Sequence, residues 1–395
     1  MTPTRTRIAA HARRAAVVAV ALAALCTAAW PAGQDATGYR RIADLAPEVG
    51  MSPRSALVQG PDGLMYGTAT RGGQVHGTVF RVDGFRHLTA THVFAADGSE
   101  GDGPGPLIVG SDGWLYGSTR EALLLGYVWR LSTTGEFQML YSFTWTGSGS
   151  FRNPGGPMAR DAEGNLYVAL EEGGSVGGGG LFRLAPDGRL DLLHEFLGRD
   201  DGAHPLGGVT LGPDGRLYGT ARDGGTFGAG TVFSIAPDGS DFVVLHEFVD
   251  GPDGCGIESP LAVGPDGALY GANPGCGPRN GGVTFRVGTD GSFTALHAFG
   301  HFDRLGESPA GVSFGPDGTL YGTTSTGGRR GGGTVFRMTP DGAGTPLHAF
   351  LAYSSADGMQ PWAAPTALAD GTLWGTTYRG GRDDDGTVYA FGASR

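Results

Sequence analysis

The stretch Gly212-Pro213-Asp214-Gly215-Arg216-Leu217-Tyr218-Gly219-Thr220 recurs, with small changes, along nearly the whole of the 395-residue chain. Seven copies occur, each centred on an acidic residue followed by glycine: Asp62-Gly63, Asp112-Gly113, Glu163-Gly164, Asp214-Gly215, Asp266-Gly267, Asp317-Gly318 and Asp370-Gly371. Their glycines follow one another at intervals of 50, 51, 51, 52, 51 and 53 residues. A nearly fixed period of this size indicates a repeat architecture.

One full unit, residues 206–248, contains four short segments with the composition of β-strands. They span residues 206–211, 216–221, 231–235 and 241–248, and we call these positions a, b, c and d. Pro-Asp-Gly joins a to b and again c to d, and between hydrophobic runs it predicts a tight turn in which glycine takes a positive φ. A glycine-rich loop joins b to c. Four short strands joined in this way predict an antiparallel meander, the blade of a β-propeller.

The two ends of the chain indicate how the ring closes. The last unit supplies segments 366–369, 372–378 and 387–391 but no d strand, whereas residues 39–45 precede the first unit and have the composition of one. We therefore expect an all-β, seven-bladed β-propeller of four-stranded antiparallel blades, closed by an N-terminal strand at about residues 39–45 that pairs into the last blade. A solenoid is disfavoured, because helical spacing is absent and tight Asp-Gly turns occur twice in each unit.

The N-terminus has the pattern of a secretory signal peptide. Four arginines precede an apolar run at residues 15–29, which ends in small residues. A membrane anchor needs about 20 apolar residues, and Leu25 disfavours a lipoprotein signal at Cys26. We expect a cleaved signal at residues 1–29, a linker at 30–38 and a single propeller at 39–395. The mature protein is then exported, periplasmic or extracellular, monomeric and not inserted in a membrane.

Composition excludes several classes of function. The sequence has no lysine, so Schiff-base and lysine-base chemistry are excluded. The formal net charge of −11 argues against nucleic acid and anionic membrane surfaces as partners. With 39% hydrophobic residues and 75 glycines, the chain is glycine-rich yet has enough apolar material for a core. No serine-nucleophile elbow, metal-ligand spacing or phosphate loop occurs, and we expect neither cofactor nor metal.

Two cysteines, Cys255 and Cys276, remain after signal cleavage. A lone pair in an oxidising compartment favours a disulfide. Cys255 falls in the loop before the fifth blade and Cys276 in the b–c loop of that blade. The predicted topology places both loops on one face, which supports the pairing.

Connections in a meander alternate between the two ends of the strands. The tight a–b and c–d turns therefore share one face, the tight-turn face, and the longer b–c and d–a loops share the other, the loop face. Binding residues are frequent on loops carried by a rigid scaffold. We expect a ligand on the loop face, although a solvated rim is the plainer interpretation. The candidate residues are Arg71, Arg120, Trp145, Glu171, Glu172, Arg222, Asp223, Arg279, Arg329, Trp362, Arg379 and Asp384.

Histidines recur at one place on strand d. Because strand d is outermost in a blade, these side chains are spread around the rim and cannot converge on a metal ion, and we interpret them as structural. They are His92, His194, His246, His297 and His348, with Tyr141 at the same place in blade two. Blade two is the most irregular unit, and its leucines at 123–125 are expected to plug the channel or to form a contact patch.

The motif Leu-Tyr-Gly-Thr, then Gly-Gly, then Gly-Thr-Val-Phe resembles the bacterial GloVer tandem repeat. Residues 320–324, 327–328 and 333–336 carry it, as do residues 231–233. The resemblance covers all seven units, roughly residues 50–391, with departures at 126–129 and 180–182. It implies an exported or surface-attached protein and brings no established activity or functional residues.

Two functions fit these observations. The first is a non-enzymatic binding scaffold for a glycan, peptide or cell-surface partner on the loop face. The second is a propeller enzyme, a lyase or hydrolase acting on a polysaccharide or glycopeptide. An enzyme needs convergent acid–base groups, but the acidic residues Glu171, Glu172 and Asp383–Asp385 come from two different blades. We favour binding and assign no catalytic residue.

Overall fold

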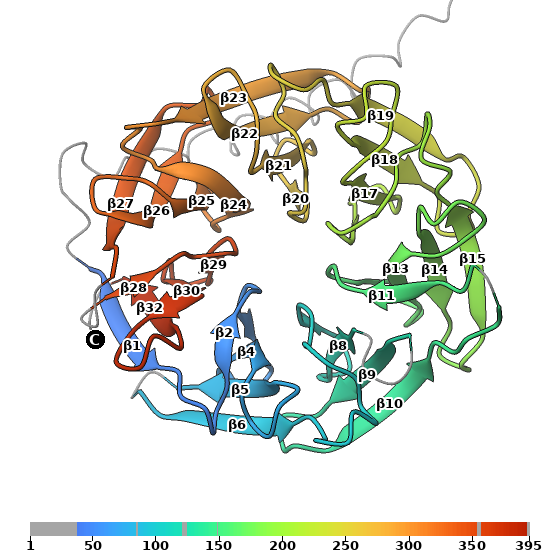
Figure 1. The fold of residues 1–395 in the computed structure, drawn as a ribbon, viewed down its shortest axis with the longest axis horizontal. Helices are drawn as coiled ribbons and strands as arrows, with labels where there is room; N and C mark the ends of the chain where they lie inside the picture. The colour runs from blue at the N-terminus through green and yellow to red at the C-terminus, as the bar shows by residue number, and fades with distance from the viewer. Residues whose placement is uncertain (1–37, 84–85, 121–124, 148, 354–356, 393–395) are drawn as a thin grey trace, which may run out of the picture. The chain divides into compact units, whose positions relative to one another are not determined.

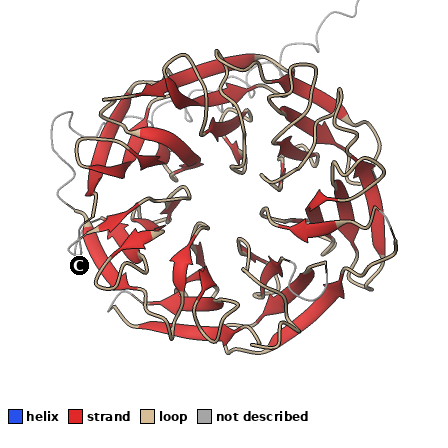
Figure 2. Cartoon of the chain, in the orientation of Figure 1, coloured by secondary structure: helices blue, strands red, loops and turns tan. Residues whose placement is uncertain are grey.

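Seven antiparallel sheets surround a common centre, as predicted for a seven-bladed β-propeller (Figure 1). The structure is a computed structural model that describes residues 38–83, 86–120, 125–147, 149–353 and 357–392. The expected signal peptide and residues 30–37 of the expected linker lie outside the described residues, as do the blade-two leucines at 123 and 124. Figure 2 shows strands and loops throughout the described chain, which contains no helix.

In every blade but the sixth, the inner strand is shorter than the outer one; in blade six, β24 and β27 both have eight residues (Figure 1). Blade one consists of β2 (Met51–Pro53), β3 (Val58–Gln59), β4 (Met65–Arg71), β5 (Thr78–Val82) and β6 (Leu88–Val93), and blade two of β7 (Ile108–Val109), β8 (Leu115–Thr119), β9 (Tyr127–Leu131) and β10 (Phe137–Ser142). Blade three consists of β11 (Arg152–Pro154), β12 (Ala159–Arg160), β13 (Leu166–Glu172), β14 (Gly180–Leu184) and β15 (Leu190–Glu195). Blade four consists of β16 (Val209–Leu211), β17 (Leu217–Ala221), β18 (Thr231–Ile235) and β19 (Val243–Glu247).

Blades five to seven complete the ring. Blade five consists of β20 (Ala262–Val263), β21 (Leu269–Asn273), β22 (Asn280–Val287) and β23 (Phe293–Gly300). Blade six consists of β24 (Glu307–Phe314), β25 (Leu320–Thr326), β26 (Gly331–Met338) and β27 (Gly344–Leu351). Blade seven consists of β29 (Thr366–Ala367), β30 (Leu373–Thr377), β32 (Thr387–Phe391) and β1 (Arg40–Asp44). A small ladder of β28 (Gly358–Met359) and β31 (Arg379–Gly380) lies beside blade seven.

The N-terminal strand closes the ring. β1 pairs antiparallel with β32, so that Arg40 lies opposite Ala390 and Asp44 lies opposite Thr387. The strand order of this sheet is β1-β32-β30-β29, which makes β1 the outer strand of blade seven. The predicted closure is therefore confirmed.

An aspartate fastens each a–b turn to the strand that follows; it is the repeated acidic residue in every blade but the third, where Asp161 takes this role. In blade four, Asp214 accepts a hydrogen bond from the backbone N–H of Arg216 at 3.2 Å and another from the Tyr218 hydroxyl at 2.6 Å. Gly215 has a φ of 81°, as the turn requires. Tyr66, Tyr116 and Tyr270 donate to their turn aspartates in the same way. The repeated stretch is therefore a structural element.

The glycine of the Leu-Tyr-Gly motif makes room for an aromatic ring. A Cβ at Gly219 would lie 2.5 Å from the ring of Phe233, which is fully buried on β18. The apolar core is divided among the gaps between blades, and one cluster joins Leu181 and Phe196 of blade three to Val209 and Phe233 of blade four. Each buried large side chain stabilises the ring by about 1.5–3 kcal/mol.

Histidines on the outer strands join neighbouring blades. His194 of β15 hydrogen bonds through Nε2 to Asp201 at 3.1 Å and stacks on Phe242 of the next blade, with ring centroids 3.7 Å apart. His92, His246 and His348 likewise stack on an aromatic ring of the next blade. Each of them also hydrogen bonds to a different carboxylate. His297 pairs with Asp303. The five histidines thus form five separate pairs around the rim.

The inner part of the loop face is held by backbone hydrogen bonds between blades. Asn153, His204 and Gln360 each have a positive φ, of 60°, 55° and 58°, and each N–H donates to a carbonyl of the preceding blade, in its b–c loop or, for Gln360, at Gly332 of β26. Ser52 closes the ring in the same way by donating to Asp385 at 2.8 Å. Proline follows each of these four residues. These bonds set the positions of the side chains that come next in the chain.

Candidate ligand-binding face

A disulfide reinforces the loop face at blade five. Cys255 and Cys276 are joined, with their Cα atoms 5.4 Å apart, and Cys255 also forms a β-bridge with Gly275. The predicted disulfide is therefore confirmed. Among the described residues, one group brings three potential metal ligands together, Asp250 with these two cysteines. The disulfide already engages both sulfur atoms, so this group does not suggest a metal site.

Four successive blades contribute to a charged group that we call the Glu171 network: Arg120, Glu171, Arg222, Asp223 and Glu258. Glu171, on β13, has a side chain only 13% exposed and lies 3.4 Å from Arg120 and 3.8 Å from Arg222. Arg222 also pairs with Asp223 at 2.9 Å and with Glu258 at 3.7 Å. Each of the three carboxylates therefore faces at least one of the two guanidinium groups, and Arg222 is shared by all three.

A second group, the Arg54 cluster, joins blade one to blade seven. It consists of Arg54, Trp362 and Tyr378. The Arg54 Cζ atom lies 4.7 Å from the Trp362 ring centroid and 5.0 Å from that of Tyr378, and the two rings are 5.3 Å apart. Arg54 Nη2 also donates to the Tyr378 hydroxyl at 3.4 Å. Such cation–π contacts contribute about 0.5–1 kcal/mol each when exposed.

The electrostatic surroundings of Tyr378 are positive. The hydrogen bond from Arg54 lowers the pKa of the Tyr378 phenol, against the opposing effect of burial, and a hydrogen bond from Ser52 and the charges of Arg54 and Arg71 act in the same direction. Arg71 ends β4, where it lies opposite Met51 of β2. Two arginine charges, those of Arg54 and Arg71, therefore act on the phenol in this part of the loop face.

The other candidate residues lie outside these two groups. Glu172 pairs with Arg152, Arg379 with Asp384 at 3.5 Å, and Arg279 with Asp303 at 3.8 Å. Trp145 is 66% exposed and Arg329 is also exposed.

Sequence reasoning missed Arg54, Glu258 and Tyr378. Arg54 follows Pro53, and Trp362 follows Pro361 at the same place of the repeat. The position directly after this proline is therefore the sequence feature from which Arg54 could have been predicted as a neighbour of Trp362.

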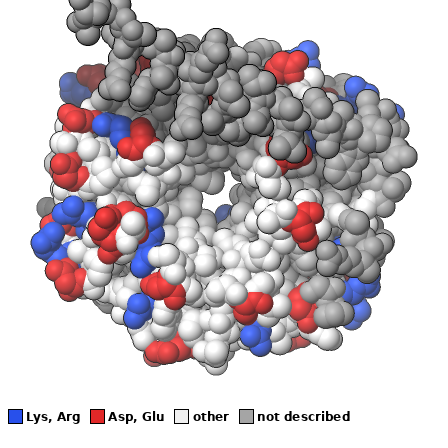
Figure 3. Space-filling view, turned by 180° about the vertical axis from the view of Figure 1, so that it is seen from behind, with Lys and Arg blue, Asp and Glu red and all other residues white. Residues whose placement is uncertain are grey.

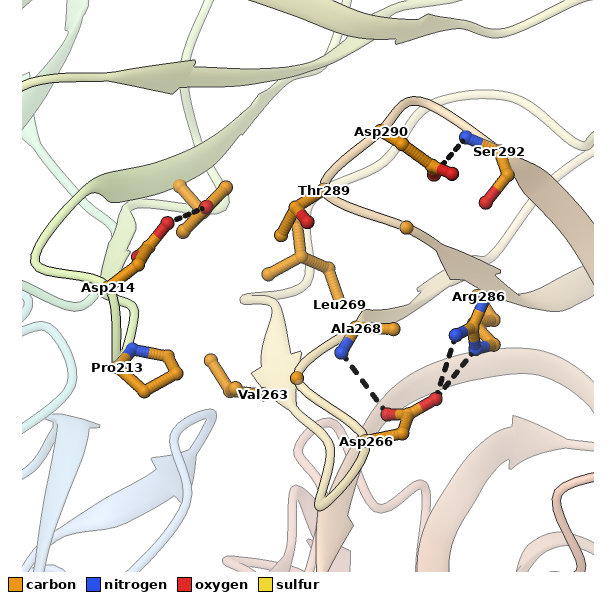
Figure 4. Close-up of a pocket in the computed structure, with 13 residues that line it drawn as sticks. Pro213, Asp214, Val263, Asp266, Ala268, Leu269, Arg286, Thr289, Asp290 and Ser292 are labelled. Atoms are coloured by element: carbon orange, nitrogen blue, oxygen red, sulfur yellow. Dashed lines mark hydrogen bonds and ion pairs between the residues drawn. The ribbon is translucent and has the colours of Figure 1, made fainter. Parts of the chain in front are cut away.

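The two hollows described between blades lie on the tight-turn face. One, of about 430 Å³, lies between blades four and five, where Asp266 accepts hydrogen bonds from the Ala268 N–H and from Arg286 (Figure 4). The other, of about 290 Å³, lies between blades two and three and contains the Arg160–Asp112 ion pair. Because both occur at the same place of the repeat, the geometry of neighbouring blades accounts for them.

The molecule is also hollowed at the centre of the ring. Figure 3, seen from the side opposite to Figure 1, shows this hollow, and the described atoms next to it are largely neither acidic nor basic. Charged side chains gather farther out on this side. Within the described residues, no helix is present that has the length and apolar character needed to cross a bilayer.

The fold and its two faces define an all-β, seven-bladed propeller built from tandem repeats. Residues 121–311 match the model of the Gloeobacter/Verrucomicrobia repeat, which confirms the predicted resemblance to the GloVer repeat over this part of the chain. No curated protein matches the chain in sequence.

Solved structures match the fold over most of the chain. The extracellular domain of a hybrid two component system from B. thetaiotaomicron has a TM-score of 0.61 and 12% identity, with 90% of this chain and 42% of that chain covered. The extracellular domain of a one component system from the same organism has a TM-score of 0.60 and 12% identity, with 89% and 40% covered. The chain thus spans less than half the length of these structures, and the likeness concerns the fold alone.

Proposed function

We propose that this protein is an exported binding scaffold that holds a saccharide on its loop face, at the Arg54 cluster. The observation that carries the proposal is the Trp362 ring, which is 41% exposed and is held in place by contacts with Arg54 and Tyr378. An exposed aromatic ring offers a flat apolar surface to the C–H face of a sugar, and neighbouring polar groups can bind its hydroxyls. The rigid propeller supplies a preorganised base.

Export is supported by the N-terminal signal pattern and by the disulfide, since disulfides persist in oxidising compartments. The two similar solved structures are extracellular domains, which agrees with a periplasmic or extracellular location.

Binding without chemistry is favoured because each carboxylate of the Glu171 network already pairs with an arginine. Glu171 lies between two guanidinium groups, so its carboxylate is engaged in ion pairs. One observation favours the alternative, a lyase or hydrolase: burial, followed by the charges of Asp383, Asp384 and Glu48, raises the pKa of Asp385. Substitution of Asp385 by asparagine would abolish turnover in that case.

The test is a screen of the exported protein against saccharides and cell-wall fragments that scores retention and product formation together. We expect retention without products, and a loss of about tenfold or more in affinity for Trp362→Ala. Phe227→Ala, which removes another exposed aromatic ring from the loop face, is the matched control and should retain binding. Turnover, or unchanged retention in Trp362→Ala, would reject the proposal.

A further inference from the structure

The guanidinium of Arg54 is held in place without a carboxylate partner among the described residues. Its contacts are the faces of Trp362 and Tyr378 and the Tyr378 hydroxyl. Elsewhere on the loop face, Arg120, Arg152 and Arg222 all pair with glutamate or aspartate. The residue is also exposed. Arg54 is therefore positioned like an ion-pairing arginine whose anion is supplied from outside the described chain.

A second cation, Arg71, belongs to the same part of the loop face. Arg71 forms no ion pair with any acidic residue in the described part of the chain, and its charge, like that of Arg54, acts on Tyr378. In the b–c loop of blade seven, Asp384 is engaged by Arg379 and by the N–H of Gly380, and the backbone carbonyl of Asp385 accepts a hydrogen bond from the Ser52 N–H. Arg54 and Arg71 are thus both without a carboxylate partner in the described part of the chain, although the protein as a whole is acidic.

An arginine stacked on aromatic rings has a defined orientation. Contacts through the flat face leave available those N–H groups at the edge of the guanidinium that Tyr378 does not engage, and this planar edge matches the two oxygen atoms of a carboxylate. The exposed Trp362 ring lies within 4.7 Å of the Arg54 Cζ atom, so a sugar on the ring and a carboxylate on the guanidinium fit one ligand.

We propose that the Arg54 cluster is a subsite for a uronate, a sugar unit that carries a carboxylate, with Arg54 binding the carboxylate and Trp362 packing on the sugar ring. This inference rests on the proposed saccharide-binding function and narrows it to acidic saccharides. Arg71 strengthens the attraction of the ligand through its charge, and Tyr378 positions the guanidinium.

The experiment measures affinity by calorimetry for uronate tetramers, including tetragalacturonate, each paired with its fully methyl-esterified form. The two members of a pair have the same sugars and linkages and differ in charge. We expect the full-length wild-type protein to bind one of the acids at least about tenfold more tightly than its ester. Raising the salt concentration should reduce this preference.

Variants of Arg54 test whether this residue causes the preference for the acid over its ester. Arg54→Gln should bind acid and ester equally, with the ester affinity of the wild type, and Arg54→Lys should keep only part of the preference, because lysine lacks the planar edge. Arg189→Gln removes the same charge from the tight-turn face and should behave as wild type. Melting temperatures at neutral pH verify that each variant is folded.

The outcomes separate the two proposals. Equal affinity for acid and ester in the wild type, or an unchanged preference in Arg54→Gln, rejects the uronate subsite and leaves saccharide binding intact. Failure of all acids, esters and neutral saccharides to bind rejects both. Equally tight binding of tetra-aspartate shows that the site recognises a carboxylate without its sugar, and this also overturns the uronate assignment.

Discussion

The phenol ring of Tyr39 lies face to face with the imidazole of His348, with ring centroids 3.7 Å apart and the planes inclined by 5°. The Tyr39 hydroxyl donates at 2.7 Å to Asp357, the carboxylate that also bonds to His348 Nε2. Tyr39 directly precedes β1, whereas His348 lies on β27 of blade six. The histidine–aromatic contact that joins other blades therefore also joins the two ends of the chain.

Removal of the Tyr39 ring should weaken the closure of the propeller. We expect Tyr39→Ala to lower the free energy of unfolding by about 3 kcal/mol, because it deletes a packed aromatic ring together with a hydroxyl donor. Tyr39→Phe keeps the ring and should cost about 1 kcal/mol. Urea unfolding followed by tryptophan fluorescence measures both.

The control for this experiment is Tyr353→Ala, because the Tyr353 side chain is 92% exposed. Its effect should stay within about 0.5 kcal/mol. Equal unfolding midpoints for Tyr39→Ala and wild type would contradict the role given to the closure contact. Deletion of residues 39–45 should have the largest effect of all.

Acidification should destabilise the blade contacts made by His194 and His246. Burial lowers the pKa of both imidazoles below 6.5 and outweighs the opposing effects of Asp201 and Asp253. The unfolded histidines bind protons near pH 6.5 and the folded ones only at lower pH, so stability is present above pH 6.5 and is lost as pH falls toward the folded values. Each histidine contributes a slope of at most about 1.4 kcal/mol per pH unit.

The pH effect can be assigned by replacing both histidines with tyrosine, the residue that Tyr141 supplies at this place in blade two. Melting temperatures of the double variant and wild type are compared between pH 8 and pH 5. We expect a smaller decline for the double variant. A decline as steep as in wild type would show that other groups cause the acid sensitivity.

The hydroxyl of Tyr389 is fully buried and has no hydrogen-bond partner among the described protein atoms. A buried hydroxyl without a partner costs about 1–3 kcal/mol. We therefore expect Tyr389→Phe to be neutral or stabilising, as phenylalanine already occupies this place in blade four as Phe233. Tyr218→Phe, which removes a bonded hydroxyl, should instead cost about 1 kcal/mol. Thermal unfolding of both variants distinguishes these outcomes, and a destabilised Tyr389→Phe would contradict the first.

Reduction of the disulfide should destabilise the protein. The two cysteines are 21 residues apart, and the chain-entropy model gives about 3 kcal/mol for a loop of this size. We expect a lower melting temperature in the presence of a reductant. The Cys255→Ser, Cys276→Ser double variant should match the reduced wild type and should not respond to the reductant, and a response in that variant would show that the reductant acts elsewhere.

Most of the fold was predictable because each blade repeats the same local rules. The expected strands at 231–235 and 387–391 agree with β18 and β32 residue for residue. Inner strands were overestimated, since the expected 206–211 shortens to Val209–Leu211. The reason is that the N–H groups of Leu206 and Gly208 donate to the nearby carbonyls of His204 and Pro205, in a turn that follows the contact of His204 with Gly178 of blade three. Contacts between blades are not visible in a local pattern.

The candidate site was predictable only in part. The loop face and Trp362 were identified from topology and residue type. The partner of Trp362, Arg54, was not, because Arg54 and Tyr378 are 324 positions apart and meet only when the ring closes. Arg120, Glu171 and Arg222 were named as candidates, but their mutual pairing depends on the spacing of neighbouring blades.

The pairing of β1 with β32 also imposes an order on assembly. A ribosome adds about 5–20 residues per second, so the partner of Arg40 at Ala390 is made on the order of half a minute after Arg40 itself. During that interval the first strand has no edge to join, and blade seven has no outer strand. β1 is thus the first strand of the propeller to be synthesised and the last to pair. Any factor that binds the chain during synthesis or export must keep β1 from pairing with another strand until β32 has been made.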